Sequence, residues 1–152
     1  MNSLEFKTTV NVFESPKELS NEDQMLFEKA REAASFSYSP YSRFPVGAAM
    51  LLSSGKIILG SNQENASFPA GICAERVALS NLAMQAPEEK IKTLAILIDA
   101  DPPAAPCGIC RQSLHQQEHL QQQNIRILLK GKADAVYELN SVKSLLPLPF
   151  TF

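Results

Sequence analysis

Apolar and polar residues follow two different spacings along this chain, and the spacing changes at turn-forming residues. Short apolar runs rich in β-branched residues are typical of strands. The run at residues 92–99 is apolar almost throughout, as expected of a strand buried on both faces. A hairpin is predicted where Ser53-Ser54-Gly55 separates two such runs. In chain order, strands are predicted at residues 6–13, 46–52, 56–62, 92–99 and 125–129.

Apolar residues three or four positions apart predict helices in four other segments. The first helix begins after Ser20, which is a good N-cap residue and has Asp23 three positions later, a variant of the capping box. Pro40 then ends it, because the residue before a proline avoids the helical conformation. Helices are predicted at residues 21–35, 72–84, 107–117 and, as a short segment, 141–146.

Strands that alternate with helices indicate an α/β fold, namely a three-layer α/β/α sandwich in which helices cover both faces of a mixed β-sheet. A chain of 152 residues can bury one sizeable core, so residues 1–152 are predicted to form a single domain. Residues 1–20 precede the first predicted helix, and we interpret them as an N-terminal extension of unknown role.

Composition and charge restrict the class of partner. Hydrophobic residues make up 45% of the chain and charged residues 20%, as in ordinary globular proteins. The net charge of −2 argues against a broad nucleic-acid-binding surface, which should be basic. No apolar run has the length of a membrane span, and no secretory signal is expected at the start. Three Cys residues are an odd number, so we expect reduced thiols in the cytoplasm and no disulfide scaffold.

The three Cys residues all lie in two motifs, Cys73-Ala74-Glu75 and Pro106-Cys107-Gly108-Ile109-Cys110. Cys107 and Cys110 are three positions apart, so they lie on one helix face and can bind one ion. Three thiolates predict a zinc site with an open fourth position, which is typical of catalytic zinc. Each motif begins a predicted helix, where the positive end of the helix dipole stabilises thiolates. Glu75 is predicted to move protons without binding the metal.

Other interpretations of these residues remain open. A Cys-x-x-Cys pair also occurs in redox proteins, although a third Cys favours a metal. A closed structural zinc site would need a His, but His115 and His119 lie about 140° and 180° around the helix from Cys110, given about 100° per residue. Both His residues are therefore expected at the surface. Glu75 could simply complement the helix dipole. Arg76 could form a surface ion pair, or it could donate to the thiolates and offset their negative charge.

These motifs are similar to those of the small, homotetrameric, zinc-dependent cytidine deaminases. Three Cys ligands and a nearby Glu that is not a ligand are the signature of zinc deaminases. Two other segments resemble those of relatives that act on free nucleosides: Phe44-Pro45-Val46-Gly47-Ala48 and Asn62-Gln63-Glu64-Asn65-Ala66. The resemblance extends over about residues 31–150 and rests on residues 39–49, 62–66, 73–76 and 106–112.

The resemblance also implies roles at the metal. Cys73, Cys107 and Cys110 would bind one zinc ion per subunit, and Glu75 would carry protons between water and substrate.

For the substrate, the resemblance implies that Phe44 packs on the pyrimidine ring and that Asn62 and Glu64 hydrogen-bond the ribose 3′-hydroxyl, with Ala74 alongside. Phe150 is similar to a C-terminal aromatic that reaches the base in a neighbouring subunit, so a homotetramer with shared active sites is implied. These polar and aromatic residues could instead have ordinary structural roles. Phe68 stands where many relatives have Tyr, which puts one polar contact in doubt.

The leading hypothesis is hydrolytic deamination of cytidine and 2′-deoxycytidine to the uridines and ammonia, as part of pyrimidine salvage. A second hypothesis is deamination of another cytosine-bearing small molecule, such as blasticidin S. The third is a nucleic-acid cytosine deaminase, which the acidic composition disfavours. The fourth is a zinc-stabilised module without enzymatic activity.

Overall fold

The computed structural model describes residues 1–151 and contains a six-stranded mixed β-sheet with the order β1-β6-β5-β4-β2-β3. β4 and β5 pair in parallel, and the other neighbouring strands pair antiparallel. The strands are β1 (Asn11–Phe13), β2 (Val46–Leu52), β3 (Ile57–Ser61), β4 (Ile91–Ile98), β5 (Arg126–Lys130) and β6 (Val136–Leu139).

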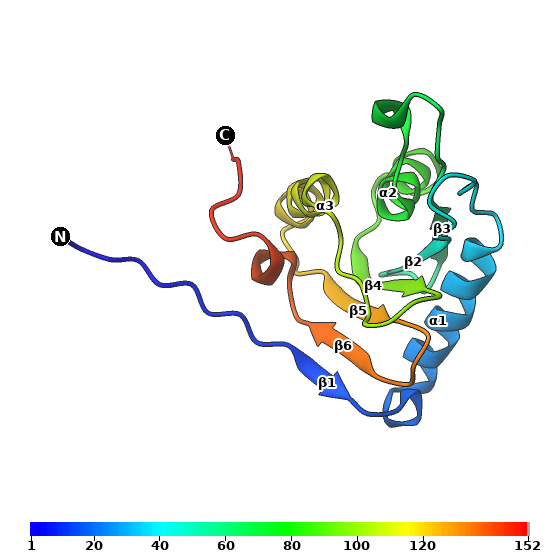
Figure 1. The fold of residues 1–152 in the computed structure, drawn as a ribbon. Helices are drawn as coiled ribbons and strands as arrows, with labels where there is room; N and C mark the ends of the chain where they lie inside the picture. The colour runs from blue at the N-terminus through cyan, green and yellow to red at the C-terminus, as the bar shows by residue number, and fades with distance from the viewer. Residues whose placement is uncertain (152) are drawn as a thin grey trace.

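Helices cover both faces of this sheet, with α1 on one face and α2 and α3 on the other (Figure 1). The predicted three-layer α/β/α arrangement is therefore confirmed. The α-helices are α1 (Asn21–Ala34), α2 (Ala74–Gln85) and α3 (Gly108–Gln121), and three short 3-10 turns are η1 (Pro16–Glu18), η2 (Phe68–Ala70) and η3 (Val142–Leu145).

The hydrophobic core is divided by the sheet, because successive strand residues point to opposite faces. Met50 and Leu94 face α2 and α3, whereas their neighbours Leu51 and Ala95 face α1. The central strand β4 is buried along almost its whole length, as its continuous apolar run predicts. Because β4 is buried on both faces, its ends are held in a fixed position in the molecule.

Most sequence-based boundaries agree with the structure to within a few residues. Ser20 is the N-cap of α1, and its side chain accepts a hydrogen bond from the backbone N–H of Asp23, as predicted. The edge strand β1 is shorter than expected. Strand β6 was not predicted at all, because its four residues are too few to show a period. Its pairing with both β1 and β5 stabilises it.

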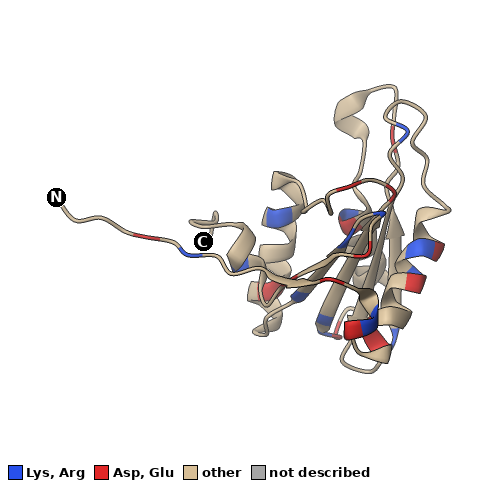
Figure 2. Ribbon diagram, turned by 60° about the horizontal axis from the view of Figure 1, so that its bottom comes forward, with Lys and Arg blue, Asp and Glu red and all other residues tan. Residues whose placement is uncertain are grey.

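Basic and acidic residues lie side by side on α1, so this helix has no strongly basic face (Figure 2). Lys29 pairs with Glu32, and Arg31 with Glu28, one turn apart. Within residues 1–151, no helix combines the length and the apolar character needed to cross a membrane.

Candidate active site

The starts of α2 and α3 bring the two Cys motifs together. Cys73 and Cys107 are the N-cap residues of these helices and have extended backbones, with ψ angles of 155° and 167°. Neither side chain caps its own helix, so both sulfur atoms are available for another partner. Cys110 is buried in the first turn of α3. The three sulfur atoms lie within 4.8 Å of one another.

This spacing fits a zinc ion. Two sulfurs bound to the same tetrahedral zinc at about 2.3 Å lie about 3.8 Å apart. The Sγ atoms of Cys73 and Cys107 are 3.7 Å apart. Among the described residues, this metal-binding group contains the three Cys thiols and no His or carboxylate. The ligand set is therefore suited to one zinc ion per chain with one coordination position left for another molecule.

Hydrogen bonding within the cluster favours a thiolate. The pKa of the Cys73 thiol is lowered to about 6, mainly by a hydrogen bond from the Cys110 thiol. The positive charge of Arg76, in the first turn of α2, lowers the same pKa. The hydrogen bond to Cys73, followed by burial, raises the pKa of Cys110, so this thiol holds its proton until a metal replaces it.

Glu75 is buried in the first turn of α2, with 5% of its surface exposed. Removal from water raises the pKa of its carboxyl group, and the neighbouring charge of Cys73 adds to this effect. Residues two positions apart do not face the same way in a regular helix. Here they do, because Cys73 lies at the extended N-cap, and both residues line one cavity.

That cavity has a volume of about 340 Å³ and lies over the carboxyl end of β4. It contains most residues singled out in the sequence. Ile96, Ile98, Ala104 and Ala105 were not among the predicted residues, because small and apolar side chains carry no chemical signature. The lining consists of Ser42, Phe44, Val46, Asn62, Glu64, Cys73, Ala74, Glu75, Ile96, Ile98, Ala104, Ala105 and Cys107.

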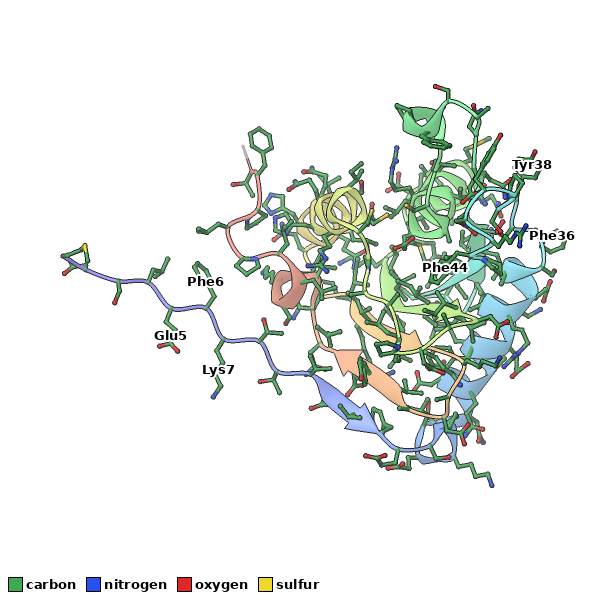
Figure 3. All side chains as sticks on the ribbon, viewed as in Figure 1. Glu5, Phe6, Lys7, Phe36, Tyr38 and Phe44 are labelled. Carbon is green, nitrogen blue, oxygen red and sulfur yellow. The ribbon has the colours of Figure 1, made fainter. Side chains whose placement is uncertain are left out.

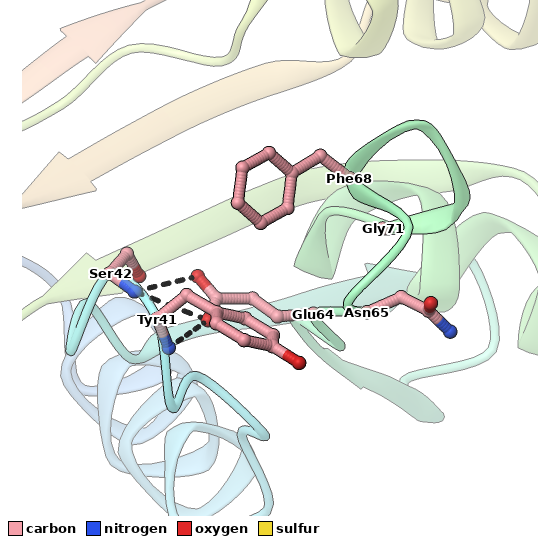
Figure 4. A pocket seen from close by; sticks show the side chains of 6 residues that line it. All are labelled: Tyr41, Ser42, Glu64, Asn65, Phe68 and Gly71. Carbon is pink, nitrogen blue, oxygen red and sulfur yellow. Dashed lines mark hydrogen bonds between the residues drawn. The ribbon is translucent and has the colours of Figure 1, made fainter.

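Glu64 holds the loop that follows α1. Its carboxylate accepts hydrogen bonds from the backbone N–H groups of Tyr41, at 2.8 Å, and of Ser42, at 3.2 Å (Figure 4). Hydrogen bonds, first from the Ser42 side chain and then from these N–H groups, lower its pKa. Glu64 and Ser42 also line a second hollow of about 300 Å³, which Tyr41 and Phe68 border with an edge-to-face contact. Glu64 therefore lies between the cavity beside the thiol cluster and this second hollow, and its lowered pKa favours the negatively charged carboxylate.

Asn62 fixes the position of Phe44. Its amide donates to the carbonyl oxygen of Phe44 at 2.9 Å and accepts from the backbone N–H of Val46 at 2.8 Å and the hydroxyl of Ser37 at 2.6 Å. One amide hydrogen remains for a ligand. Phe44 lies nearer the sheet, while Phe36 and Tyr38 lie at the outer edge of the molecule (Figure 3).

Comparison with known proteins agrees with this geometry. The family described as "Cytidine and deoxycytidylate deaminase zinc-binding region" matches residues 20–123. A curated protein named cytidine deaminase from Halalkalibacterium halodurans is 38% identical over 128 residues, which are 84% of this chain and 93% of that protein. The chain belongs to the cytidine deaminase family.

Solved structures of the cytidine deaminase family have the same fold. The cytidine deaminase of Burkholderia pseudomallei superposes with a TM-score of 0.75 at 34% identity, covering 87% of this chain and 100% of that one. The cytidine deaminase of Mycobacterium tuberculosis gives a TM-score of 0.70 at 29% identity, covering 88% and 100%. The sandwich is thus that of a zinc-binding deaminase.

Phe150 is the one predicted substrate-binding residue that does not line the cavity of its own chain in this cytidine deaminase fold. Its surface is 65% exposed. The Gln112 amide on α3 fixes its backbone by donating to the Phe150 carbonyl oxygen at 2.9 Å and accepting from its N–H at 3.2 Å. The tail is therefore held on α3 while the ring faces outward.

The expectation that His115 lies at the surface is wrong. Its surface is 5% exposed, and neither ring nitrogen has a hydrogen-bond partner within residues 1–151. Arg111 and Glu118, one turn before and one turn after it, bond to the backbone of Leu145 and Val142. The C-terminal segment therefore covers this side of α3. His119 is exposed, as predicted, and neither His joins the thiol cluster.

Proposed function

We propose that this member of the cytidine deaminase family hydrolyses cytidine and 2′-deoxycytidine to uridine and 2′-deoxyuridine with release of ammonia. The observation that carries the proposal is the buried Glu75 in one cavity with the three-thiol cluster. A proton carrier beside an open metal position is what hydrolysis of an amino group requires. The names of the relatives support cytosine nucleosides as the substrate class.

A zinc ion held by Cys73, Cys107 and Cys110 would supply a Lewis acid that makes a water molecule more acidic. Glu75 accepts a proton from that water and passes it to N3 of the pyrimidine ring, which makes C4 electrophilic. The water oxygen, which still carries its second proton, bonds to C4. Glu75 then takes that proton from the oxygen and gives it to the amino group, so that the C4–N bond breaks, ammonia leaves and a carbonyl group remains at C4. The raised pKa of Glu75 suits this exchange, because a group that holds and releases protons works best near the ambient pH.

The remaining polar groups would orient the nucleoside. Glu64 accepts from the ribose 3′-hydroxyl, and Asn62 contributes its remaining amide hydrogen. Phe44 packs on the pyrimidine ring at the rim of the cavity, beside Ala74. The lining contributed by residues 1–151 contains two carboxylates, Glu64 and Glu75, and no Lys or Arg. This charge favours an uncharged nucleoside over a nucleotide, whose phosphate would meet negative charge.

The site is completed in a homotetramer, in which the Phe150 tail of one subunit covers the base bound to another. Support comes from the outward-facing ring of Phe150 on a backbone held by Gln112. Arg76 stabilises the thiolates by its charge. Free thiols suit a reducing cytoplasm, where the reaction would serve pyrimidine salvage.

The proposal is tested by following the ultraviolet absorbance of cytidine, 2′-deoxycytidine, cytidine 5′-monophosphate and a cytosine-containing oligonucleotide with the zinc-loaded protein. We expect rapid loss of the cytosine spectrum with both nucleosides and slow or no change with the phosphorylated substrates. Turnover of blasticidin S but of neither nucleoside would favour the second hypothesis. Stoichiometric zinc without turnover of any substrate would favour the fourth hypothesis, a zinc-stabilised module without enzymatic activity.

A further inference from the structure

Residues 1–10, which we call the arm, form an extended segment that leaves the body of the molecule (Figure 1). Apolar and polar residues alternate over residues 3–7, where Leu4 and Phe6 lie between Ser3, Glu5 and Lys7. Leu4 and Phe6 are 74% and 50% exposed, and Val10 continues the same side into β1. Phe6 points to one side of the chain, and Glu5 and Lys7 point to the other (Figure 3). This is the pattern of a strand with one face on a protein surface.

The direction of the arm is fixed by its own domain. β1 pairs antiparallel with β6 at the edge of the sheet, with Asn11 opposite Glu138. The Asn11 amide donates to the Glu138 carboxylate at 2.8 Å. Further out, the Thr8 hydroxyl donates to the carbonyl oxygen of Ser144 in η3, also at 2.8 Å. Residues 1–7 then extend beyond this anchor, a reach of roughly 23 Å at about 3.3 Å per residue.

The C-terminal tail, which is the segment after η3, begins beside this hydrogen bond between Thr8 and Ser144. It follows η3, to which Thr8 is bonded, and it carries Leu148 and Phe150 with exposed side chains. Both termini leave the body on the same side, in both views of the ribbon (Figures 1 and 2). The arm and the tail therefore carry exposed apolar side chains on the same side of the molecule.

The chemistry of the arm favours another protein surface over a nucleic acid or an anionic membrane. Glu5 and Lys7 carry opposite charges on its polar side, and the chain as a whole has a net charge of −2. Neither feature attracts phosphate groups. The partner that the tail is proposed to enter is a second copy of this chain, so the arm would meet the same copy.

We propose that the arm packs its apolar side, formed by Leu4, Phe6 and Val10, on a second copy of this chain. The inference rests on the proposed function for the identity of the partner. In a two-fold pair each subunit would give one arm and receive one. The family match begins at residue 20, after the arm and β1.

The surface that the arm contacts is identified with a photo-crosslinking amino acid at position 6 in the full-length zinc-loaded protein. We expect a product of twice the 16.7 kDa of one chain on a denaturing gel. A crosslink only within one chain would mean that the arm folds onto its own domain. Absence of any crosslink would also overturn the proposal.

The contribution of the apolar side chains of the arm to subunit association is tested by light scattering over a dilution series with the Leu4→Ser, Phe6→Ser double variant. We expect its subunits to dissociate at concentrations at which the unmodified protein stays assembled, with association roughly a hundredfold weaker. The matched control is the Glu5→Ser, Lys7→Ser variant, which alters the polar side and should assemble normally. Equal assembly of both variants, or an unmodified protein that is a monomer, would overturn the inference.

These outcomes are separable from failure of the proposed function. If the deaminase proposal is wrong, the unmodified protein turns over no cytosine nucleoside at any concentration, whatever its mass. If only the arm inference is wrong, the unmodified protein is active and the Leu4→Ser, Phe6→Ser variant keeps both its mass and its activity on dilution.

Discussion

Gly60 in β3 lies directly against Ala74 at the start of α2, so closely that a Cβ on Gly60 would collide with the Ala74 carbonyl oxygen. The same Cβ would stand 2.9 Å from the Cα of Ala78, one turn further along. Ala74 separates Cys73 from Glu75 in the sequence. This contact therefore sets the distance between the sheet and both the metal-binding thiol and the carboxylate.

Replacing Gly60 with Ala should push the first turn of α2 away from β3. We expect a loss of about 1–3 kcal/mol in unfolding free energy and weaker zinc binding, with reduced turnover. Thermal melts, metal analysis and kinetics on cytidine measure the three effects. Gly108→Ala is the control, because a Cβ there meets no atom within 4 Å. A Gly60→Ala protein with normal zinc content and turnover would show that this contact does not position the site.

Glu75→Gln should retain zinc and fold but lose turnover by about 10²–10⁴-fold or more. The amide has the shape of the carboxylate but cannot accept and return a proton. Zinc content and melting temperature, measured on the same preparation, distinguish lost chemistry from lost structure. Loss of zinc would identify Glu75 as a ligand or a structural support instead.

Cys107→Ala should lose both zinc and activity, because two remaining thiols form an incomplete site. Metal analysis after dialysis and steady-state kinetics test this. Ser113→Ala is the control and should keep both properties, because Ser113 is a half-buried residue of the same helix whose hydroxyl donates to the Ile109 carbonyl oxygen. Full turnover by metal-free protein would overturn the proposed mechanism.

Glu64→Ala should reduce turnover of cytidine more than that of 3′-deoxycytidine, by a further factor of about ten to a hundred. Glu64 also holds the backbone of Tyr41 and Ser42, so part of the loss should be common to both substrates. The difference between the two substrates isolates the sugar contact. Equal losses would restrict Glu64 to supporting the loop.

Deleting residues 150–152 should weaken substrate binding, because the base would lose an apolar cover supplied by another subunit. The test mixes this truncated protein with the Glu75→Gln variant. Hybrid sites that combine an intact Glu75 with the intact tail of a neighbour should regain activity. Verified mixed oligomers that stay inactive would show that each subunit builds its site alone.

Long periodic segments made most of the fold predictable. Residues 92–99 could be assigned as a strand buried on both faces, because every position in such a strand selects apolar side chains. Val136–Leu139 could not, since four residues carry no usable period and their conformation depends on β1 and β5 alongside. Edge elements of this kind are determined by tertiary pairing.

The site was predictable where the chemistry demands particular residue types. Thiols and a carboxylate at fixed spacing identify Cys73, Glu75 and Cys107, which the structure brings to one cavity. Ile96 and Ile98 line the same cavity but resemble any core residue. His115 was placed wrongly, because a polar residue opposite the metal-facing side of a helix is expected in water. The C-terminal segment covers it, and helix periodicity contains no information about that distant segment.

The short distance between Cys73 and Cys107 also has a topological meaning. The two residues are 34 positions apart in the chain, and their sulfur atoms are 3.7 Å apart. A shared zinc ion would close this stretch into a loop that contains the whole of α2 and β4. By analogy with a disulfide, closing a loop of this length lowers the entropy of the unfolded chain by the equivalent of about 4 kcal/mol. While zinc stays bound, the central strand could then separate from its neighbours only within a closed ring.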